Sequence, residues 1–429
     1  MPHGLSRRLF LLSYNLLWLS VLPAVLLRLL WRARRQPAYL HHLRERFGGY
    51  RVRAPGPVIW LHAVSVGETR AAAPLIRALL EHYPEHSVVL THMTPTGRET
   101  SESLFGEEPR VLRVYLPYDF DPFVARFLRH FRPVSGIVME TELWPGLLIA
   151  CQRRGVPVLL ANARLSARSA RAYARAGAIA RLALGALTAV AAQTEADAAR
   201  LSALGARRVA VSGNIKFDSA PPEDAFALAA QFRARCGARP LILAASTREG
   251  EEALILEAFL RARAQGGADA LLILTPRHPH RFDETAAILH ARGLAMARRS
   301  AGQDVPPGVC VWLGDSMGEM FAYYAAADVA LIGGSWLPFG GQNLIEACAV
   351  GTPVLLGPYT FNFRQVAEAA AAAGAARRCE DVEAAMQTAF ALLADAPARA
   401  AMSAAGRRFA IANRGAAART LVLLDEIVS

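Results

Sequence analysis

The chain has 429 residues, of which 53% are hydrophobic and 20% are charged, so it can bury large cores and is not a disordered protein. Its length exceeds one ordinary core, which predicts two domains. The formal net charge of +12 indicates an anionic partner. Because the arginines lie along alanine-rich stretches without interleaved aromatic residues, we expect a lipid or membrane surface and no nucleic acid.

The cysteines are widely spread, and no CxxC pair or His/Cys cluster occurs in the sequence. Neither a disulfide framework nor a structural zinc site is therefore indicated, and a reducing compartment fits. The five cysteines are Cys151, Cys236, Cys310, Cys348 and Cys379.

An almost uninterrupted apolar run, Leu9 to Leu27, opens the chain and just reaches the length of a bilayer core. More arginines follow the run than precede it, which predicts that the rest of the chain stays in the cytoplasm. No small-residue cleavage site follows, so a secretory signal is not indicated. Asn15, Pro23 and Arg28 weaken a span, so the segment either crosses the membrane or lies in its interface; a buried helix of a soluble core is the alternative.

After this run and a basic linker (37–57), short apolar stretches alternate with lengths that fit helices, the pattern of a parallel doubly wound sheet. A first series of strands is predicted at Val58–His62, Ser87–Thr91, Val111–Leu116, Val134–Met139, Val156–Ala161, Ala189–Gln193 and Arg208–Val211. A second series is predicted at Leu241–Ala245, Ala270–Leu274, Leu294–Ala297, Val309–Trp312, Asp328–Ile332 and Pro353–Leu356. Pro221 to Asp224 reads as a hinge, so we expect an α/β protein of two Rossmann-like halves facing a cleft.

A glycine-rich loop, Gly333 to Gly341, follows the strand Asp328–Ile332 and leads into a predicted helix. Such a loop presents free backbone N–H groups and a positive helix end to an anion. Asn343 and Glu346 are three residues apart and would share a helix face, where they could hold a sugar diol or a base edge. A plain tight turn is the alternative.

Glu68 follows the first strand, whose carboxyl end faces the ligand crevice in an open α/β sheet. It is a candidate catalytic carboxylate. With Ser65 it also forms a capping-box pattern, and a helix N-terminus would lower its pKa, which does not suit a base.

Other strand ends carry polar loops that could bind a nucleotide or an acceptor. They are Glu140 to Pro145, Asn162 to Ser166, Ser246 to Glu252, Thr275 to Pro279 and Gly314 to Glu319. A lone Asp315 at a helix start is more often an N-cap than a metal ligand, so no metal site is predicted. No GxxxxGK[ST] loop, HExxH motif or GxSxG elbow occurs.

Together these motifs resemble the 3-deoxy-D-manno-octulosonic acid (Kdo) transferase family over nearly the whole chain. The matching segments are the N-terminal apolar run, Ser65–Glu68, Glu140–Pro145, Asn162–Ser166, Ser212–Asp218, Pro276–Pro279, Gly314–Glu319 and Gly357–Phe363. The resemblance implies a GT-B glycosyltransferase with an N-terminal membrane-anchor helix, and inverting transfer of Kdo from CMP-Kdo to a phosphorylated lipid A precursor, lipid IVA, in lipopolysaccharide biosynthesis. It implies no cofactor and a place at the inner membrane, with the catalytic domains on the cytoplasmic face.

By the same resemblance, Glu68 is the general base. The residues that match CMP-binding segments are Pro276, Arg277, Met317, Gly318, Glu319, Asn343, Leu344, Ile345 and Glu346. Candidate contacts to the acceptor or to Kdo are Glu142, Arg164, Lys216, Ser246, Thr247 and Arg248. The chain departs from the family at Gln342 and Arg248, where histidine is common, so no role that needs imidazole carries over to either position.

The expected domains are a membrane anchor (1–36), an acceptor domain (37–219), a CMP-Kdo donor domain (220–396) and C-terminal helices that pack back across both (397–429). Two alternatives remain. One is another GT-B membrane glycosyltransferase that uses a UDP-sugar donor and a lipid-linked acceptor. The other is a membrane-attached nucleotide- or lipid-binding protein without catalysis.

Overall fold

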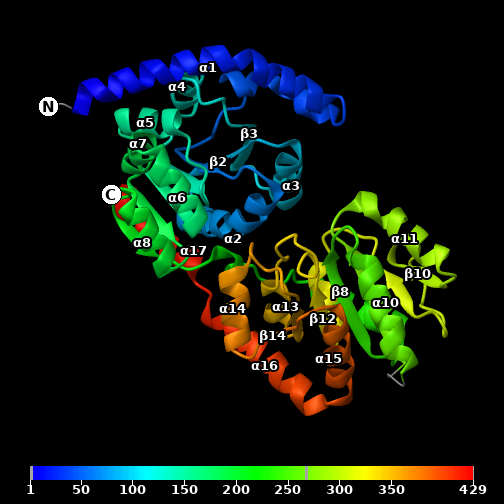
Figure 1. The fold of residues 1–429 in the computed structure, drawn as a ribbon. Coiled ribbons are helices and arrows are strands. Elements are labelled where there is room, and N and C mark those ends of the chain that lie inside the picture. Colours follow the sequence, from blue (N-terminus) through cyan, green and yellow to red (C-terminus); the bar gives the residue numbers. More distant parts are fainter. Residues whose placement is uncertain (1–2, 266–268, 429) are drawn as a thin grey trace. The chain divides into compact units, whose positions relative to one another are not determined.

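The computed structural model describes residues 3–265 and 269–428, which form two compact units (Figure 1). Unit 1 comprises Met1–Ser219 and Arg414–Ser429, and unit 2 comprises Ala220–Asn413. The chain therefore enters unit 2 beside the hinge that Pro221 to Asp224 predicts, and it returns to unit 1 at its end.

Unit 1 contains a seven-stranded parallel sheet in the order β3-β2-β1-β4-β5-β6-β7. The strands are β1 (Val58–His62), β2 (Ser87–His92), β3 (Val111–Tyr115), β4 (Ser135–Met139), β5 (Val158–Ala163), β6 (Ala189–Ala192) and β7 (Val209–Val211). The order reverses between β1 and β4, the place where ligands bind in open α/β sheets.

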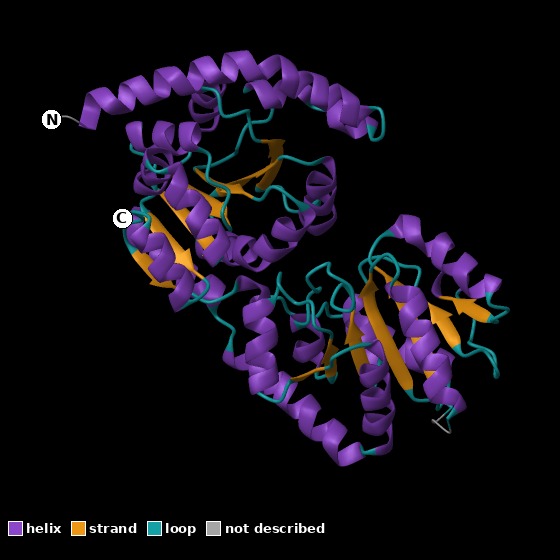
Figure 2. Ribbon diagram, in the orientation of Figure 1, coloured by secondary structure: helices purple, strands orange, loops and turns teal. Residues whose placement is uncertain are grey.

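Helices cover both faces of this sheet (Figure 2). Alternate residues of β1 enter different cores: Val58 and Trp60 pack on one face, and Ile59 and Leu61 on the other. The helices of unit 1 are α1 (His3–Ala33), η1 (Pro37–Leu40), η2 (Leu43–Phe47), α2 (Val66–His82), α3 (Pro95–Phe105), α4 (Asp121–Phe131), α5 (Pro145–Arg153), α6 (Ala167–Ala176), α7 (Ala178–Ala186), α8 (Glu195–Ala203), η3 (Ile215–Asp218) and α17 (Ala416–Val428).

Unit 2 contains a second seven-stranded parallel sheet, in the order β10-β11-β9-β8-β12-β13-β14. The strands are β8 (Leu241–Thr247), β9 (Leu271–Pro276), β10 (Met296–Arg298), β11 (Val311–Leu313), β12 (Val329–Ile332), β13 (Val354–Leu356) and β14 (Ala376–Arg378). The expected α/β fold with two parallel sheets is thus confirmed. The sequence missed β14, because this three-residue edge strand ends in two exposed arginines and has no apolar run.

Helices lie on both faces of the second sheet as well. On one face, α10 and α15 form the core with the strands. On the other, Phe232 of α9 packs edge-on against Trp312 of β11, with Tyr323 of α12 beside both. The helices of unit 2 are α9 (Ala225–Cys236), α10 (Glu251–Ala264), η4 (Pro279–Arg281), α11 (Phe282–Ala291), η5 (Arg299–Ala301), α12 (Met320–Ala326), α13 (Ile345–Val350), α14 (Arg364–Ala372), α15 (Val382–Ala394) and α16 (Ala396–Ala412).

The last helix, α17, packs in unit 1 against α2, where Leu421 and Leu424 join the core that contains Leu75 and Leu79. Asp218 fixes the start of α17, since its carboxylate accepts hydrogen bonds from the N–H groups of Gly415 and Ala417 at 2.6 Å each. The preceding helix, α16, belongs to unit 2.

Within the described residues, Leu11–Ala33 of α1 is the one stretch that is long and apolar enough, by length and composition, to cross a membrane. Figure 1 shows α1 lying along unit 1 beside α4. Tyr14 donates a 2.6 Å hydrogen bond to the buried carboxylate of Asp119, and Asn15 accepts one from the N–H of Asp121. The less exposed residues of α1 from Leu11 onward recur with helical spacing, so one stripe of the helix contacts unit 1 and its other apolar side chains are exposed.

The sequence indicated a basic linker at 37–57. In the structure this segment packs as part of unit 1. Glu45 is buried and accepts hydrogen bonds from the N–H of Tyr115 and from Arg98. Arg46 is also buried, with its guanidinium 4.0 Å from the ring centroid of Tyr115. The basic composition of the segment suggested an exposed linker, because these contacts are made with residues far away in the chain.

Candidate active site

The carboxyl ends of β1 and β4 are adjacent in unit 1, because the two strands pair in parallel from Ile59–Ser135 to His62–Val138. Glu68, in the first turn of α2, follows β1, while Glu140 and Glu142 follow β4. The fold therefore brings three carboxylates to the switch point of the first sheet.

Glu68 is partly buried and held by its own loop. Its Oε2 accepts a hydrogen bond from the N–H of Val64 at 2.9 Å, and its Oε1 accepts one from the hydroxyl of Ser65 at 3.2 Å. Ser65 is the N-cap of α2, but its side chain accepts no hydrogen bond from the helix, and Glu68 accepts from the N–H of Val64 rather than from that of Ser65, so the capping box predicted from sequence is not formed.

Burial raises the pKa of Glu68 to about 7; the N–H of Val64 opposes this shift, and the charges of Glu140 and Glu142 add to it. The expectation that the helix N-terminus would lower this pKa is therefore wrong. Loss of water and two carboxylates from another strand end outweigh the local hydrogen bonds. A carboxylate with a pKa near neutrality suits a general base.

Glu140 has a left-handed backbone, with φ of 56°, which is uncommon for a residue with a side chain. Its carboxylate lies 3.4 Å from the Nζ of Lys216 in η3. Burial raises the pKa of Glu142, and Glu140 adds to that effect. The Arg164 carbonyl accepts a hydrogen bond from Thr141, so the loop after β5 borders the same place. Unit 1 thus brings its four predicted site residues, Glu68, Glu142, Arg164 and Lys216, together around the loop that follows β4.

Unit 2 repeats this geometry at the pair β8–β12, its own switch point. Ser246 has a φ of 57° at the end of β8, and the chain passes very close to it after β12. A Cβ at Gly333 would lie 2.4 Å from the Ser246 carbonyl oxygen, so only glycine fits there without displacement. The loops 246–250 and 333–344 therefore leave the sheet side by side.

The loop after β12 ends in a short helix, α13, which begins at Ile345. Asn343 lies just before this helix: its Oδ1 accepts from the N–H of Ile345, and its Nδ2 donates to Glu346 at 3.0 Å. The two polar residues that the sequence paired do meet, although Asn343 lies outside the helix. Leu344 and Ile345 are buried beneath them.

The segment after β9 lies next to β8, since the N–H of Arg277 donates to the Thr247 carbonyl at 2.9 Å. Pro276 is buried at the strand end. Burial lowers the pKa of His278, and the nearby charges of Arg277 and Arg248 lower it further. These two arginines therefore form a positive region at the strand ends, where an anion would bind.

Tyr324 connects this region to α13. Burial raises its pKa well above the ordinary value; the charge of Glu346 adds to the rise and that of Arg277 opposes it. The Tyr324 hydroxyl also donates to the Asn343 carbonyl at 3.3 Å. The segments after β9 and β12 thus surround one buried tyrosine.

In the loop after β11, Met317 and Gly318 are exposed, whereas Glu319 is held by the Arg299 guanidinium in two hydrogen bonds of 2.8 and 3.1 Å. Asp315 does not act as the N-cap of α12, which the sequence had favoured. Its carboxylate accepts hydrogen bonds from Ser300 and Arg298 instead and fixes the loop after β10. Those bonds lie outside the reach of a local sequence pattern.

Arg248 has its guanidinium 4.6 Å from the ring centroid of Phe339, and its Nε donates to Glu249. The sequence indicated Glu251 and Glu252 as part of a polar strand-end loop but predicted neither their burial nor the contacts that they make. In the sequence the two glutamates look like ordinary negative charges in a first helical turn. In the structure both are completely buried.

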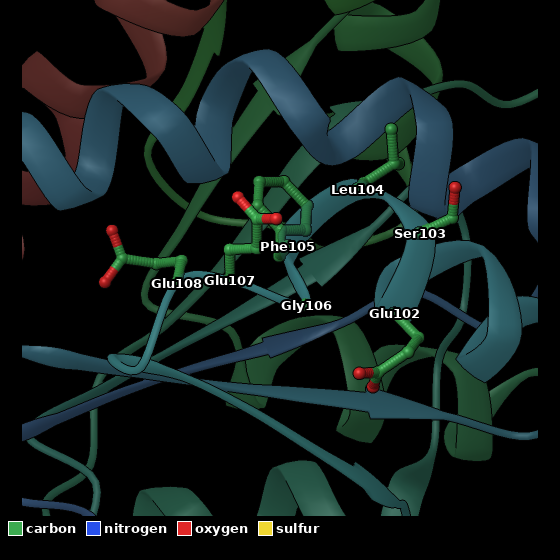
Figure 3. A pocket seen from close by; sticks show the side chains of 7 residues that line it. All are labelled: Glu102, Ser103, Leu104, Phe105, Gly106, Glu107 and Glu108. Carbon is green, nitrogen blue, oxygen red and sulfur yellow. The ribbon is translucent and has the colours of Figure 1, made fainter.

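A hollow at the end of α3 contains none of the predicted residues (Figure 3). It is lined by residues 102–108, including three glutamates. Glu102 pairs with Arg113, and Glu108 pairs with Arg110. Among the described residues, no cluster of three or more His, Cys, Asp or Glu side chains could hold a metal ion.

Comparison with solved structures first defines the class. A glycosyltransferase from Rickettsia africae superposes with a TM-score of 0.57 at 14% identity, covering 87% of this chain and 99% of that one. Two parallel doubly wound sheets of this kind are the GT-B fold, and the chain has this fold.

The family follows from the sequence comparisons. Residues 41–219 match the family model described as 3-deoxy-D-manno-octulosonic-acid transferase (kdotransferase). The chain is 48% identical over 423 residues to the 3-deoxy-D-manno-octulosonic acid transferase of Bordetella pertussis, covering 96% of this chain and 98% of that protein. It is 36% identical to the Haemophilus influenzae enzyme of the same name, over 96% of this chain and 97% of that protein. The chain belongs to the Kdo transferase family and is therefore a glycosyltransferase.

Proposed function

We propose that the protein transfers Kdo from CMP-Kdo to a phosphorylated lipid A precursor, lipid IVA, with inversion at the sugar and with Glu68 as general base. The observation that carries the proposal is the Glu68 carboxylate at the switch point of unit 1, whose pKa is raised to about 7. Membership of the Kdo transferase family supports the sugar that is transferred.

The chemistry needs one proton acceptor and a site for the leaving group. Kdo is a keto-sugar acid, so departure of CMP generates an oxocarbenium-like centre. In the proposed step the acceptor hydroxyl oxygen forms a bond to that carbon, its proton passes to Glu68, and the bond from the carbon to the CMP phosphate oxygen breaks. A positioned base contributes roughly 10²–10⁴-fold to such a reaction.

The donor nucleotide is assigned to unit 2. Arg277 and Arg248 supply positive charge for the CMP phosphate, and the Asn343–Glu346 pair supplies an amide and a carboxylate for the ribose diol or the cytosine edge. Met317 and Gly318 are exposed in the loop after β11, the strand that pairs with β9, and are assigned to cover the nucleotide. Ser246 stays a candidate contact to Kdo, whereas the Thr247 side chain is completely buried and its hydroxyl donates to Glu252.

The acceptor is assigned to unit 1, where the Nζ of Lys216 lies 3.4 Å from the Glu140 carboxylate and the backbone of Arg164 contacts Thr141 in the same loop as Glu140. Positive side chains there suit the acceptor phosphates. The exposed apolar side of α1 supports attachment to the inner membrane, with the catalytic units on the cytoplasmic face. The proposal includes no cofactor, so turnover should persist in the presence of EDTA.

The test is mass spectrometry of the products formed from lipid IVA and CMP-Kdo by the wild type, by Glu68→Gln and by Glu81→Gln. The last variant removes an exposed carboxylate from the same helix, α2, and serves as the matched control. We expect Kdo-bearing product from the wild type and the control, and almost none from Glu68→Gln. Product from a UDP-sugar in place of CMP-Kdo would support the alternative donor, and normal turnover by Glu68→Gln would refute the assigned base.

A further inference from the structure

Glu251 is a completely buried carboxylate at the start of α10, outside every residue assigned to the substrate. Four backbone N–H groups point at it. Its Oε2 accepts from Gly334 at 2.6 Å and from Arg248 at 2.8 Å, and its Oε1 accepts from Trp336 at 3.0 Å and Leu337 at 3.3 Å. A buried charge is tolerated only when it is satisfied in this way.

The four donors come from two different loops. Arg248 belongs to the loop after β8, and the other three belong to the glycine-rich loop after β12. One carboxylate thus ties together the two loops at the switch point of unit 2. The same glycine-rich loop is held on its other side, where Ser335 Oγ accepts from the N–H of Gly357 at 2.9 Å.

The next residue, Glu252, holds the segment after β9 in a similar way. It is completely buried, and the Arg281 guanidinium donates to its two oxygens at 3.0 and 3.3 Å. The Thr247 hydroxyl donates to it as well, at 3.1 Å. Arg281 lies at the end of η4, four residues after Arg277, so this buried ion pair fixes the segment that carries the positive charge.

We propose that Glu251 and Glu252 are positioning residues of the nucleotide site: Glu251 sets the 334–337 loop, and Glu252, through Arg281, sets the 276–281 segment. Neither touches substrate, because both side chains are completely buried. The inference rests on the proposed function, in that it assigns these two segments to CMP.

Glu251→Gln keeps the volume of the side chain but replaces one acceptor oxygen, which receives two hydrogen bonds, with an NH₂ group. Each carboxylate oxygen serves two N–H groups, so one pair would face the amide NH₂, which is itself a donor. If the binding-competent loop then falls to about one tenth of the molecules, the Kd for CMP rises about tenfold. The kcat at saturating CMP-Kdo should change little, since Glu68 is in unit 1 and is not altered.

The experiment compares the full-length wild type with Glu251→Gln, Glu252→Gln and Glu257→Gln. Glu257 is an exposed residue of α10 that pairs with Arg292 at 2.9 Å, so it is the matched control for loss of charge. CMP affinity is measured by titration calorimetry, KM and kcat by CMP-Kdo turnover, and local order by amide hydrogen exchange. We expect weaker CMP binding for both positioning variants, faster exchange over 334–341 in Glu251→Gln and over 276–281 in Glu252→Gln, and wild-type behaviour in Glu257→Gln.

Wild-type CMP affinity in Glu251→Gln and Glu252→Gln would overturn the inference, as would a loss of kcat with no change in KM or Kd. If Glu251→Gln fails to fold, Glu251→Asp replaces it: its shorter carboxylate keeps both oxygens but withdraws them from the loop, and the same two outcomes apply. A wild-type protein that neither binds CMP nor uses CMP-Kdo would instead refute the proposed function, so the two failures are distinguishable.

Discussion

Glu68 gives the sharpest prediction, because its titration lies within the working range of an assay. Burial, followed by the charges of Glu140 and Glu142, raises its pKa to about 7. A general base must be deprotonated to act. We therefore expect kcat/KM to fall as the pH drops below 7, with a limiting slope of one in a logarithmic plot.

The size of the effect follows from this pKa. A carboxyl group with a pKa of about 7 is roughly 9% ionised at pH 6 and roughly 91% ionised at pH 8, so kcat/KM should differ about tenfold between them. A glutamate with the ordinary pKa of 4.5 would be almost fully ionised at both, and the profile would be flat.

The neighbouring carboxylate provides an internal check. Glu142 raises the pKa of Glu68, so Glu142→Gln should move the acid limb of the profile to lower pH. Glu81→Gln, which removes an exposed charge from α2, should leave the limb in place. If Glu142→Gln and Glu81→Gln moved the acid limb equally, the shift could not be assigned to the charge of Glu142 near Glu68.

The same pKa has a consequence for stability. Because the folded protein holds the Glu68 proton more tightly than the unfolded chain does, this group's contribution to stability is fully present below pH 4.5 and is lost as the pH rises through 7. Glu68→Gln should therefore unfold at a higher temperature than the wild type at pH 8, and the difference should shrink toward pH 5.

The assay is initial-rate measurement of CMP-Kdo turnover with lipid IVA from pH 5.5 to 9, with thermal unfolding of the same samples. A flat profile above pH 5.5 in the wild type would refute the raised pKa. A profile that Glu142→Gln leaves unmoved would refute its electrostatic cause. Turnover by Glu68→Gln at the wild-type rate would refute the role of Glu68 itself.

Three further predictions concern stability. Glu252→Gln breaks a buried ion pair and should lower the free energy of unfolding by about 3–5 kcal/mol in urea titration; a change below 1 kcal/mol would show the pair to be solvated. Gly333→Ala places a Cβ 2.4 Å from the Ser246 carbonyl oxygen and should cost about 1–3 kcal/mol in thermal unfolding; an unchanged melting temperature would contradict this packing. Tyr14→Phe removes one of three hydrogen bonds to buried Asp119, at about 1–3 kcal/mol, and should speed proteolysis of α1; a digestion rate equal to the wild type would show that α1 is held by other contacts.

The sequence by itself determined the α/β fold and most of its strands. Buried parallel strands are short, nearly continuous apolar runs, and turn residues separate them clearly. Two parts of the candidate site could also be predicted from short segments: the motif around Glu68, and the Asn343–Glu346 pair. The hydrogen bond of that pair joins residues only three apart in the chain. The edge strand β14 was not predicted, since its one alanine and two exposed arginines form no apolar run.

Only the tertiary structure determined the burial and the charged neighbours of the candidate residues. The raised pKa of Glu68 depends on burial and on carboxylates from β4, more than 70 residues away in the chain, whereas the local pattern indicated the opposite shift. Likewise, Glu251 and Glu252 look like surface charges at a helix start, yet they are buried against loops that follow β12 and β9. Strand order creates these neighbours, and strand order is set by packing of the whole sheet rather than by any local segment.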